Sequence, residues 1–521
     1  MKNIEFIHQE RKTYWIVAVL FMVIKLCLHF FTNTNYELHR DEMLYFNMGD
    51  YLDWGYASVP PFIGFLAFVV KTIFGYSVFG IRFFPALLGA ASIFIMAKII
   101  RELGGSMFAL VLASTAFLFS PGFLLIDSLF TPNVIEQFLW LFITWLIFRL
   151  VKENNPKWWI WIGIFIGLAF LNKYSVAFFI AGFFIALLLS PYRKLFNSKY
   201  FILAVMIGIL IILPNIYWQY SHNWPVVNHM DELKNTQMVN RRFIDFFIET
   251  FSLNVASIFI WLFGLVALLF LKQEKKHRYL GIASLISMLL FLFSSGKGYY
   301  IMGLIPFLLA FGGFAMEKYF IGKLKVLNFA VLTVVLLTSI VALPYSLPVV
   351  SFDRLARYSD QTNHLIVFPF SRWEDGKVHP VSQVYADMTG WQELTSYVAK
   401  AYNQLPKGEQ LKCTIFAEHN YGYAGAIHFY GKEDGLPEAI TFSDSYVIWA
   451  PDSILEGPII YIFREIGELK NMYHTIKEVG CVSNPYFREK GLKVFLCTHP
   501  KVNIREIYAQ LAREAKVVYR K

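Results

Sequence analysis

The sequence predicts a polytopic α-helical membrane protein with a soluble α/β domain at its C-terminal end. Only 16% of the 521 residues are charged and the mean hydropathy is +0.48, whereas soluble domains carry about 25% charged residues. Apolar segments of spanning length recur between residues 13 and 346, and from residue 347 onward charged residues, Gly, Pro and His become frequent again. A chain so poor in charge excludes a soluble enzyme.

A bilayer-spanning helix needs about 20 apolar residues, because lipid offers no hydrogen-bond partner to an open backbone. We expect about 11–13 transmembrane helices, and eleven of them can be delimited. A further apolar run, residues 60–74, is expected to lie in the interface or to re-enter the membrane. The eleven segments are 13–31, 82–100, 106–124, 133–151, 158–172, 174–190, 200–218, 250–271, 279–295, 298–316 and 326–346.

Lys and Arg are concentrated in alternate connections, which predicts the orientation of the chain. The N-terminus is expected in the cytoplasm, and its apolar run is expected to be a retained first helix because residues 29–32 lack a cleavage pattern. The net charge of +10 then largely reflects the Lys and Arg residues of the connections expected on the cytoplasmic side. Lys25 and His29 lie one turn apart near the outer end of the first helix; ionisable groups in lipid are candidates for function, but a lysine at this place can also snorkel.

We divide the chain into a transmembrane domain, residues 1–346, and an outer soluble α/β domain, residues 347–521. An odd number of crossings places the second domain outside. The short apolar runs 413–417 and 458–463 are expected to be strands. The four cysteines lack metal-ligand spacing, and three near the C-terminus do not make a complete disulfide framework.

The first outer loop, residues 32–81, holds the most informative residues. Asp41 and Glu42 are adjacent carboxylates just beyond a membrane helix and are surrounded by aromatic residues. Carboxylates in such a place are costly unless they are functional or well hydrated, and partial dehydration suits a general base. The alternative is a solvated helix start, where acidic residues are favoured.

The order of several motifs resembles the GT-C superfamily of membrane glycosyltransferases, in particular the bacterial branch similar to protein O-mannosyltransferases and lipid A aminoarabinose transferases. The resemblance covers roughly residues 10–345, whereas the C-terminal domain matches the architecture only. The motifs that carry it are Asp41-Glu42, Trp54-Gly55-Tyr56, Pro60-Pro61, Leu171-Asn172-Lys173-Tyr174, Pro214-Asn215 with Trp218-Gln219, and Gly296-Lys297-Gly298-Tyr299-Tyr300.

The resemblance implies a polyprenyl-phosphate-linked sugar donor and places the family's catalytic carboxylate on Asp41. It also implies groups that hold the donor phosphate, for which Lys297 between two glycines is the first candidate; the alternative for Lys297 is a snorkelling interfacial lysine. We expect Arg82, Arg241 and Arg242 to bind phosphate as well, although basic residues at a helix start are often only solvated. The candidate substrate-binding residues are Tyr45, His222, Tyr299 and Tyr300.

The chain differs from many relatives at two places. Ser58-Val59 stands where an acidic residue or His often precedes the proline pair, and residues 130–133 lack a second Asp. Asp127 and Glu136 are nearby but do not occupy the matching position. We therefore assign no metal ligands and leave a divalent metal ion open.

We expect an integral membrane glycosyltransferase that passes a sugar to a lipid, glycan or protein acceptor at the outer face of a bacterial inner membrane. No nucleic-acid role is indicated. The alternative from another class is a transporter or flippase of lipid-linked sugars, which predicts ionisable residues near span centres. A third is a membrane-anchored binding protein, which needs far fewer spans.

Overall fold

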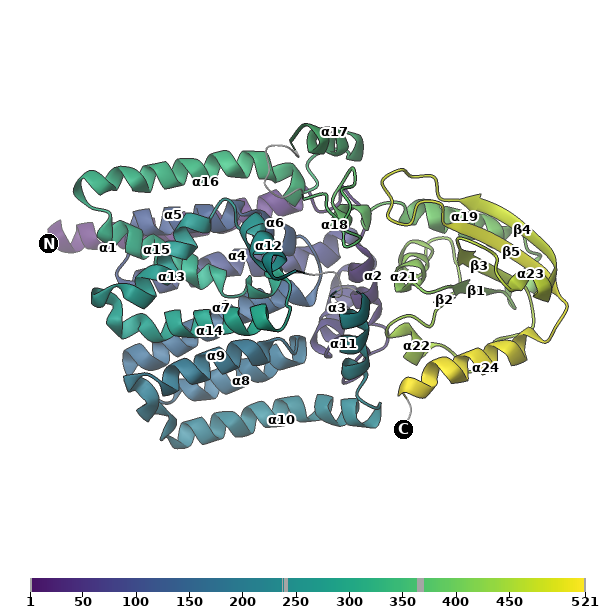
Figure 1. Cartoon of the computed structure of the whole chain (residues 1–521), viewed down its shortest axis with the longest axis horizontal. Coiled ribbons are helices and arrows are strands. Elements are labelled where there is room, and N and C mark those ends of the chain that lie inside the picture. The colour runs from purple at the N-terminus through teal and green to yellow at the C-terminus, as the bar shows by residue number, and fades with distance from the viewer. Residues whose placement is uncertain (1, 237, 239–241, 363–369, 520–521) are drawn as a thin grey trace. The chain divides into compact units, whose positions relative to one another are not determined.

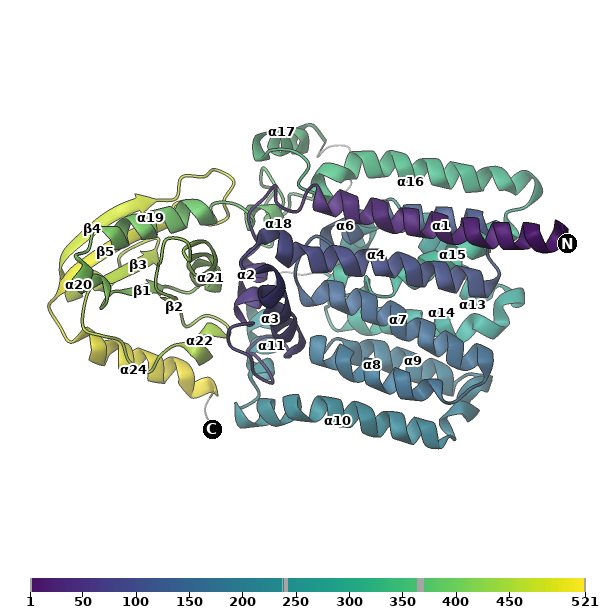
Figure 2. The ribbon, with the colours of Figure 1, turned by 180° about the vertical axis from the view of Figure 1, so that it is seen from behind.

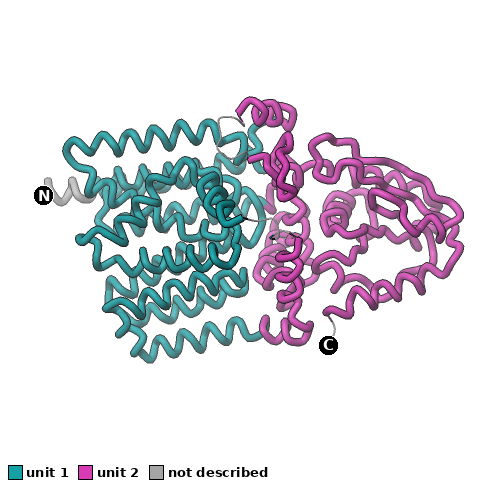
Figure 3. Tube along the Cα trace, viewed as in Figure 1, with its two compact units in different colours: residues 1–33, 82–214, 237–350 teal, residues 34–81, 215–236, 351–521 magenta. Residues whose placement is uncertain are grey.

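The fold is described from a computed structural model of the chain, which describes residues 2–236, 238, 242–362 and 370–519, with side chains from residue 9 onward. The chain forms two compact units (Figure 3). Unit 1 comprises residues 1–33, 82–214 and 237–350, and unit 2 comprises residues 34–81, 215–236 and 351–521. Residues 34–81 therefore belong to the same compact unit as residues 351–521.

Unit 1 is helical, and its long helices run side by side (Figures 1 and 2). The pairs α13 with α15, α14 with α9, and α7 with α8 are in contact. Glycines allow the closest approach: a Cβ on Gly312 would lie 2.1 Å from the Ile260 carbonyl oxygen, as is typical of small residues between membrane helices. The helices of unit 1 are α1 (Lys2–Phe30), α4 (Val78–Leu103), α5 (Met107–Phe119), α6 (Pro121–Ile126), α7 (Pro132–Glu153), α8 (Trp158–Asn172), α9 (Val176–Leu188), α10 (Lys199–Ser221), α12 (Phe243–Leu253), α13 (Ile258–Phe270), α14 (Arg278–Phe293), α15 (Ile305–Tyr319) and α16 (Lys325–Ser346); α4 begins and α10 ends within unit 2.

Among the described residues, six helices are long and apolar enough to span a membrane, or seven if a bent pair counts as one. The bent pair is α12 with α13, which meet at 113°. Four shorter apolar helices accompany them, including α3 (Phe62–Phe74) over the predicted run 60–74. The polytopic helical fold is thus confirmed.

Among the eleven predicted segments, 298–316 begins with a 3-10 helix, Gly298–Ile301, before α15 starts at Ile305, and two others are broken α-helices. Segment 106–124 divides into α5 and α6 at Pro121, since a proline holds the preceding residue, Ser120, in an extended conformation with ψ of 132°. Segment 250–271 divides at residues 254–257, where the Asn254 side chain donates to the Thr250 carbonyl. A proline in the first case and a hydrogen bond from a side chain to the backbone in the second, rather than hydropathy, mark where these helices end.

Lys25 in α1 is not a snorkelling lysine, so that alternative is excluded. Its side chain and that of Asp127 are both fully buried, with 2.7 Å between Lys25 Nζ and Asp127 Oδ2. Gln137 Nε2 donates to Asp127 Oδ1 at 3.1 Å, and Lys25 Nζ donates to the Phe123 carbonyl at 3.1 Å. A carboxylate from a distant part of the sequence therefore keeps the lysine inside.

Unit 2 contains a five-stranded mixed sheet of order β2-β1-β3-β5-β4, in which β1 pairs in parallel with β2 and β3, and β5 runs antiparallel to β3 and β4. The predicted strands 413–417 and 458–463 are confirmed as β1 and β3. The strands are β1 (Thr414–Ala417), β2 (Ala439–Ile440), β3 (Ile459–Phe463), β4 (Tyr473–Cys481) and β5 (Lys493–Pro500).

Helices cover the sheet of unit 2 (Figures 1 and 2). Tyr461, Phe495 and Cys497 pack with Tyr508 of α24 in one buried cluster, while α19 contacts β3, β4 and β5. The α/β character predicted for the C-terminal region is confirmed. The helices of unit 2 are α2 (Arg40–Asn47), α3, α11 (Pro225–Thr236), α17 (Phe352–Thr362), α18 (Gln383–Ala386), α19 (Trp391–Asn403), α20 (Lys407–Gln410), α21 (Tyr421–Tyr430), α22 (Tyr446–Trp449), α23 (Leu469–Met472) and α24 (Ile504–Lys516).

Candidate active site

Asp41 and Glu42 lie in the first turn of α2, where a capping box separates their roles. The Asp41 N–H donates to His39 Nδ1 at 3.1 Å, and the His39 N–H donates to Glu42 Oε2 at 2.9 Å. A reciprocal pair of this kind satisfies backbone donors that the helix itself leaves open. Glu42 is fully buried in this role, whereas the side chain of Asp41 is 33% exposed. Asp41 is thus the accessible carboxylate of the pair.

Tyr421 of α21 donates a hydrogen bond of 2.6 Å to Asp41 Oδ1. Two glycines let α21 lie against α2: a Cβ on Gly422 would be 3.0 Å from Arg40 Cβ, and one on Gly425 would be 2.9 Å from Met43 Cβ. A residue 380 positions away in the sequence therefore orients the Asp41 carboxylate.

Charges around Asp41 favour its ionised form. Burial alone would raise the pKa of Asp41, but the nearby positive charge of Arg40 and the hydrogen bond from Tyr421 outweigh it and lower that pKa below its ordinary value. Arg40 Nε lies 3.7 Å from Asp41 Oδ1 and 3.5 Å from Asp387 Oδ2. The carboxylate is therefore ready to accept a proton near neutral pH.

Asp387 is itself paired with Arg488, whose Nη1 donates to Asp387 Oδ2 at 2.9 Å. Arg40 Nε is buried and, among the described residues, has no hydrogen-bond partner. It provides one fixed positive group beside the exposed edge of Asp41.

The aromatic segment around Trp54 and Gly55 packs against the end of α10 within unit 2. Asn215 Nδ2 donates to the Trp54 carbonyl at 2.7 Å. A Cβ on Gly55 would lie 2.3 Å from the Trp218 ring, so only glycine allows this approach. The motif Trp54-Gly55-Tyr56 therefore contacts the motif of Asn215 and Trp218, both of which belong to the predicted resemblance.

Ser58 and its neighbour hold the loop to the C-terminal region. Ser58 Oγ donates to Asp444 Oδ1 at 3.0 Å, and the Ala57 N–H donates to Ser445 Oγ at 3.1 Å. In this chain the residues that precede Val59 and the proline pair therefore contact residues 444–445.

The remaining predicted residues of unit 2 are Tyr45 and His222. Tyr45 is half-buried and follows Asp41 by one turn of α2, so both side chains lie on the same helix face. The His222 ring stacks on Trp218 with 4.2 Å between ring centres. His222 Nδ1 lies 2.9 Å from the Trp218 carbonyl oxygen.

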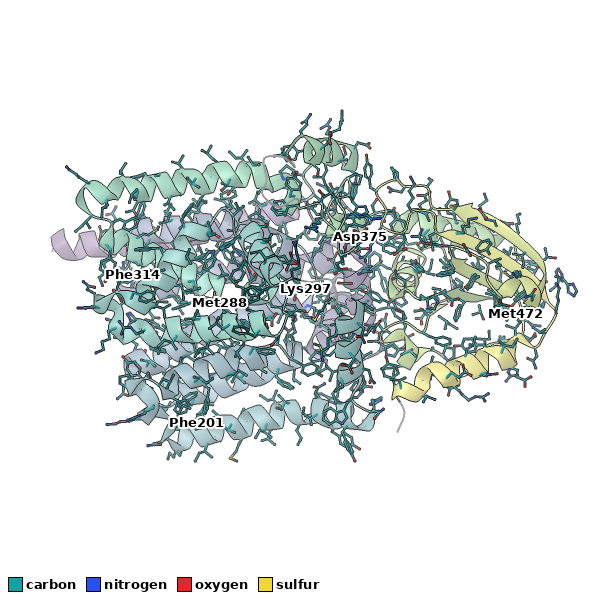
Figure 4. The ribbon with its side chains drawn as sticks, in the orientation of Figure 1. Phe201, Met288, Lys297, Phe314, Asp375 and Met472 are labelled. Atoms are coloured by element: carbon teal, nitrogen blue, oxygen red, sulfur yellow. The ribbon has the colours of Figure 1, made fainter. Side chains whose placement is uncertain are left out.

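Lys297, labelled in Figure 4, is half-buried and precedes a short 3-10 helix, Gly298–Ile301, that contacts α12 in unit 1. The Gly298 N–H donates to Glu249 Oε2 at 2.7 Å. A Cβ on Gly298 would lie 2.6 Å from the Thr250 nitrogen. The backbone that follows Lys297 therefore packs so closely on α12 that only glycine fits at position 298.

Tyr299 and Tyr300 lie close to Lys173, also in unit 1. Lys173 Nζ is 5.4 Å from the Tyr299 ring centre and 4.7 Å from that of Tyr300. It donates to Asn133 Oδ1 at 2.8 Å and to Glu136 Oε2 at 3.0 Å. Cation–π contacts and an ion pair thus place both tyrosines beside one lysine.

The three predicted arginines lie in different surroundings. Arg82 is 1% exposed and its Nη1 donates to the Asn33 carbonyl at 2.5 Å. Arg242 has an exposed side chain that pairs with Asp245 at 2.9 Å. Arg241 lies outside the described residues.

Unit 2 thus brings together Asp41, Glu42 and Tyr45, while Lys297, Tyr299, Tyr300, Arg82 and Arg242 belong to unit 1. The sequence did not indicate Tyr421, Asp387 or Arg488, and Gly422 and Gly425 were the only local sign of a close contact there. Within the described part of the chain, no three His, Cys, Asp or Glu side chains gather as a metal site.

Comparison with known proteins supports the resemblance. A family model described as dolichyl-phosphate-mannose-protein mannosyltransferase matches residues 58–218. A lipid A galacturonosyltransferase, RgtD, of Rhizobium johnstonii is 28% identical over 40% of this chain and 45% of its own length. A polyprenol-phosphate-mannose–protein mannosyltransferase of Corynebacterium glutamicum is 28% identical over 32% of this chain and 39% of its own length. The chain thus matches less than half of these relatives' length.

Solved structures extend the similarity to almost the whole chain. ArnT of Cupriavidus metallidurans bound to undecaprenyl phosphate superimposes with a TM-score of 0.64 over 92% of this chain and 98% of ArnT, at 14% identity. Apo ArnT gives a TM-score of 0.60 over 93% and 98%, also at 14% identity.

The fold is therefore that of the GT-C membrane proteins, with multiple helical spans and a C-terminal α/β region. More particularly, the resemblance to the GT-C superfamily of membrane glycosyltransferases is confirmed. None of these matched proteins is a transporter.

Proposed function

We propose that the protein is an integral membrane glycosyltransferase that moves a hexose or pentose from a polyprenyl-phosphate donor to a lipid, glycan or protein acceptor. The similarity to two transferases and to an ArnT structure holding undecaprenyl phosphate supports the donor class. The accessible Asp41 carboxylate, oriented by Tyr421, is the observation that carries the proposal. The reaction takes place at the outer face of a bacterial inner membrane, with the N-terminus in the cytoplasm and residues 347–521 outside.

Asp41 is the general base. The acceptor hydroxyl oxygen forms a bond to the anomeric carbon while the bond from that carbon to the phosphate oxygen breaks. The hydroxyl proton passes to Asp41, and the polyprenyl phosphate leaves with the bonding electrons. Such a single displacement inverts the anomeric centre. Tyr421 and Arg40 hold the carboxylate ionised until the proton arrives.

Lys297 and the arginines 82, 241 and 242 bind the donor phosphate, on which negative charge develops as the bond breaks. Tyr299 and Tyr300 contact the sugar or the phosphate, and Tyr45 and His222 contact the acceptor. Glu42 contributes by fixing the start of α2, and thereby the position of Asp41, through the capping box.

The test compares lipids and glycans by mass spectrometry from cells with and without the gene. Loss of one sugar from an envelope lipid, glycan or protein, restored by the wild-type gene, identifies the acceptor. Asp41→Asn restores about 10²–10⁴-fold less product, the loss typical of a missing general base. The matched control is Asp53→Asn in the same loop, because Asp53 is exposed and its Oδ1 accepts a hydrogen bond from the Trp54 N–H.

Two outcomes contradict the proposal. Transfer by Asp41→Asn at the wild-type rate rejects Asp41 as the base. Accumulation of a lipid-linked sugar without loss of sugar from any acceptor favours a transporter instead.

A further inference from the structure

Asp387 and Arg488 form an ion pair in unit 2 that the proposed mechanism does not use. Arg488 Nη1 donates to Asp387 Oδ2 at 2.9 Å, and the Asp387 side chain is 3% exposed. The backbone holds both residues in place. The indole N–H of Trp391, which is fully buried, donates to the Asp387 carbonyl at 2.8 Å, and the Arg488 N–H donates to the Ala386 carbonyl at 3.1 Å. The pair is therefore a fixed arrangement of two charges rather than a loose surface contact.

Arg40 connects this pair with the candidate base. Its Nε lies 3.5 Å from Asp387 Oδ2 and 3.7 Å from Asp41 Oδ1. Both distances are longer than an N–H···O hydrogen bond of about 2.7–3.2 Å, and among the described residues Arg40 Nε has no hydrogen-bond partner. Attraction between charges, rather than a directed hydrogen bond, therefore holds Nε between the two carboxylates.

Asp387 competes with Asp41 for the charge of Arg40. Arg488 neutralises Asp387, and Arg488 Nη2 also lies 3.7 Å from Glu374 Oε2. The charge of Arg40 is therefore left mainly for Asp41. Without Arg488, the Asp387 carboxylate would be buried without its cation, which is costly, and it would draw Arg40 to itself.

The protonation of Asp41 agrees with this arrangement. Burial raises the pKa of Asp41, but the charge of Arg40, the hydrogen bond from Tyr421 and the charge of Arg488 outweigh burial and lower that pKa. Arg488 thus acts on Asp41 although it is paired with another carboxylate. The titratable or charged groups of unit 2 that surround Asp41, Arg40 and Tyr421 are His39, Tyr45, Glu374, Asp387 and Arg488.

We propose that Asp387 and Arg488 are positioning residues, which keep Arg40 beside Asp41 and thereby keep the candidate base in the form that accepts a proton. Each acts through its own charge and through Arg40. The two act in opposite directions, because Arg488 favours the ionised form of Asp41 and Asp387 favours the protonated form. The inference rests on the proposed function, since it concerns the same carboxylate.

The test measures the protonation of Asp41 without any substrate. A water-soluble carbodiimide with glycine ethyl ester labels protonated carboxyl groups, and peptide mass spectrometry of the full-length protein in nanodiscs gives the labelling rate of Asp41. At about pH 5 most of this carboxyl is ionised, so the rate follows the small protonated fraction and changes about tenfold for each unit of pKa. Asp53, which is exposed, is the reference in the same sample.

The two single substitutions move this rate in opposite directions. Arg488→Gln raises the labelling of Asp41 about three- to tenfold, because a positive charge is lost and Arg40 moves toward Asp387. Asp387→Asn lowers the labelling by a similar factor, because a negative charge is lost and Arg40 then serves Asp41 alone. The double variant stays within about twofold of the wild type, since both charges of one pair are removed together.

A merely structural role gives a different result. A looser fold exposes Asp41 and raises its labelling in both single variants, so a rise in both overturns the proposal, as does an unchanged rate in both. The decrease in Asp387→Asn cannot come from misfolding and decides alone where Arg488→Gln does not fold. Arg488→Lys keeps the charge and stays near the wild-type rate; a rise equal to that of Arg488→Gln overturns the proposal. The matched controls, Arg505→Gln and Asp434→Asn, change exposed residues of unit 2 and leave the rate unchanged.

The comparison of lipids and glycans described above separates this inference from the proposed function. Opposite changes of labelling in a protein that transfers no sugar contradict the proposed function and leave the positioning of Asp41 standing. Transfer that requires Asp41, together with unchanged labelling in Arg488→Gln and Asp387→Asn, contradicts the positioning role and leaves the proposed function standing.

Discussion

At the scale of single residues, the candidate base depends on a partner from the far end of the chain. Asp41 is held by its own helix through the cap and by Tyr421 through a 2.6 Å hydrogen bond. Because that hydrogen bond stabilises the carboxylate, it also sets the pH at which Asp41 becomes able to accept a proton.

Removing the Tyr421 hydroxyl should therefore change a pH profile. In Tyr421→Phe the pKa of Asp41 rises, so the acidic limb of kcat/KM moves to higher pH by about one unit and the rate at its optimum falls about tenfold. The measurement is kcat/KM against pH for both proteins. Tyr423→Phe, two residues along α21, serves as control. A lower rate with an unmoved acidic limb would mean that Tyr421 acts only in packing.

Glu37 should make the stability of the folded protein depend on pH. It accepts hydrogen bonds from the Trp391 and Gln392 N–H groups at the start of α19, and burial raises the pKa of Glu37 to about 7. The folded state then binds the proton more tightly than the unfolded state, so stability falls as pH rises from about 4.5 to 7.

Glu37→Gln keeps an acceptor oxygen for the backbone N–H groups but cannot ionise, so the variant should not lose stability as the pH rises. The variant should match the wild type in Tm at pH 4.5 and exceed it by about 2–4 °C at pH 8. Thermal unfolding of the purified protein at both pH values tests this. A difference between variant and wild type that is the same at both values contradicts a raised pKa of Glu37.

At the scale of elements, helix ends and helix contacts depend on a few specific groups. The capping box starts α2, Pro121 separates α6 from α5, and glycines bring α21 onto α2 and α15 onto α13. Within unit 1 the buried pair of Lys25 and Asp127 joins α1 to the segment between α6 and α7.

Breaking that pair should be costly. Lys25→Met leaves the Asp127 carboxylate buried without its cation and should destabilise the protein by about 3–5 kcal/mol. Adding Asp127→Asn removes the second charge and should recover most of the loss. The measurement is the temperature at which half of the detergent-solubilised protein ceases to be monodisperse. A double variant no more stable than Lys25→Met would show that the two charges are not coupled.

At the scale of the whole molecule, residues 34–81 and 215–236 form one compact unit with the C-terminal residues 351–521. Hydrogen exchange on the full-length protein should therefore give the amides of α2 and α21 similar opening free energies, within about 1 kcal/mol, because cooperative units open together. Opening of α2 together with α1 and α4 instead would contradict this grouping. Amides of α16, in unit 1, provide the comparison.

Hydropathy and charge predicted most of this architecture. Long apolar segments predicted the helices of unit 1 because apolar composition by itself indicates burial, and short apolar runs predicted β1 and β3. The break at Pro121 was missed although the proline itself marks it in the sequence, and the break at residues 254–257 was missed because it depends on a local hydrogen bond. Asp41 was found from its neighbours in the sequence. Tyr421, Arg488 and the partner of Lys25 were not, because packing alone brings together residues so far apart in the chain.

The composition of unit 2 from three separate stretches of sequence has a consequence for the order of synthesis. Ribosomes add roughly 5–20 residues per second, so α2 is complete roughly 20–80 s before Tyr421 is made. During that interval Asp41 lacks the group that orients it. A nascent or prematurely terminated chain thus carries the carboxylate without its partner, and the candidate active site is completed only after Tyr421 has been synthesised.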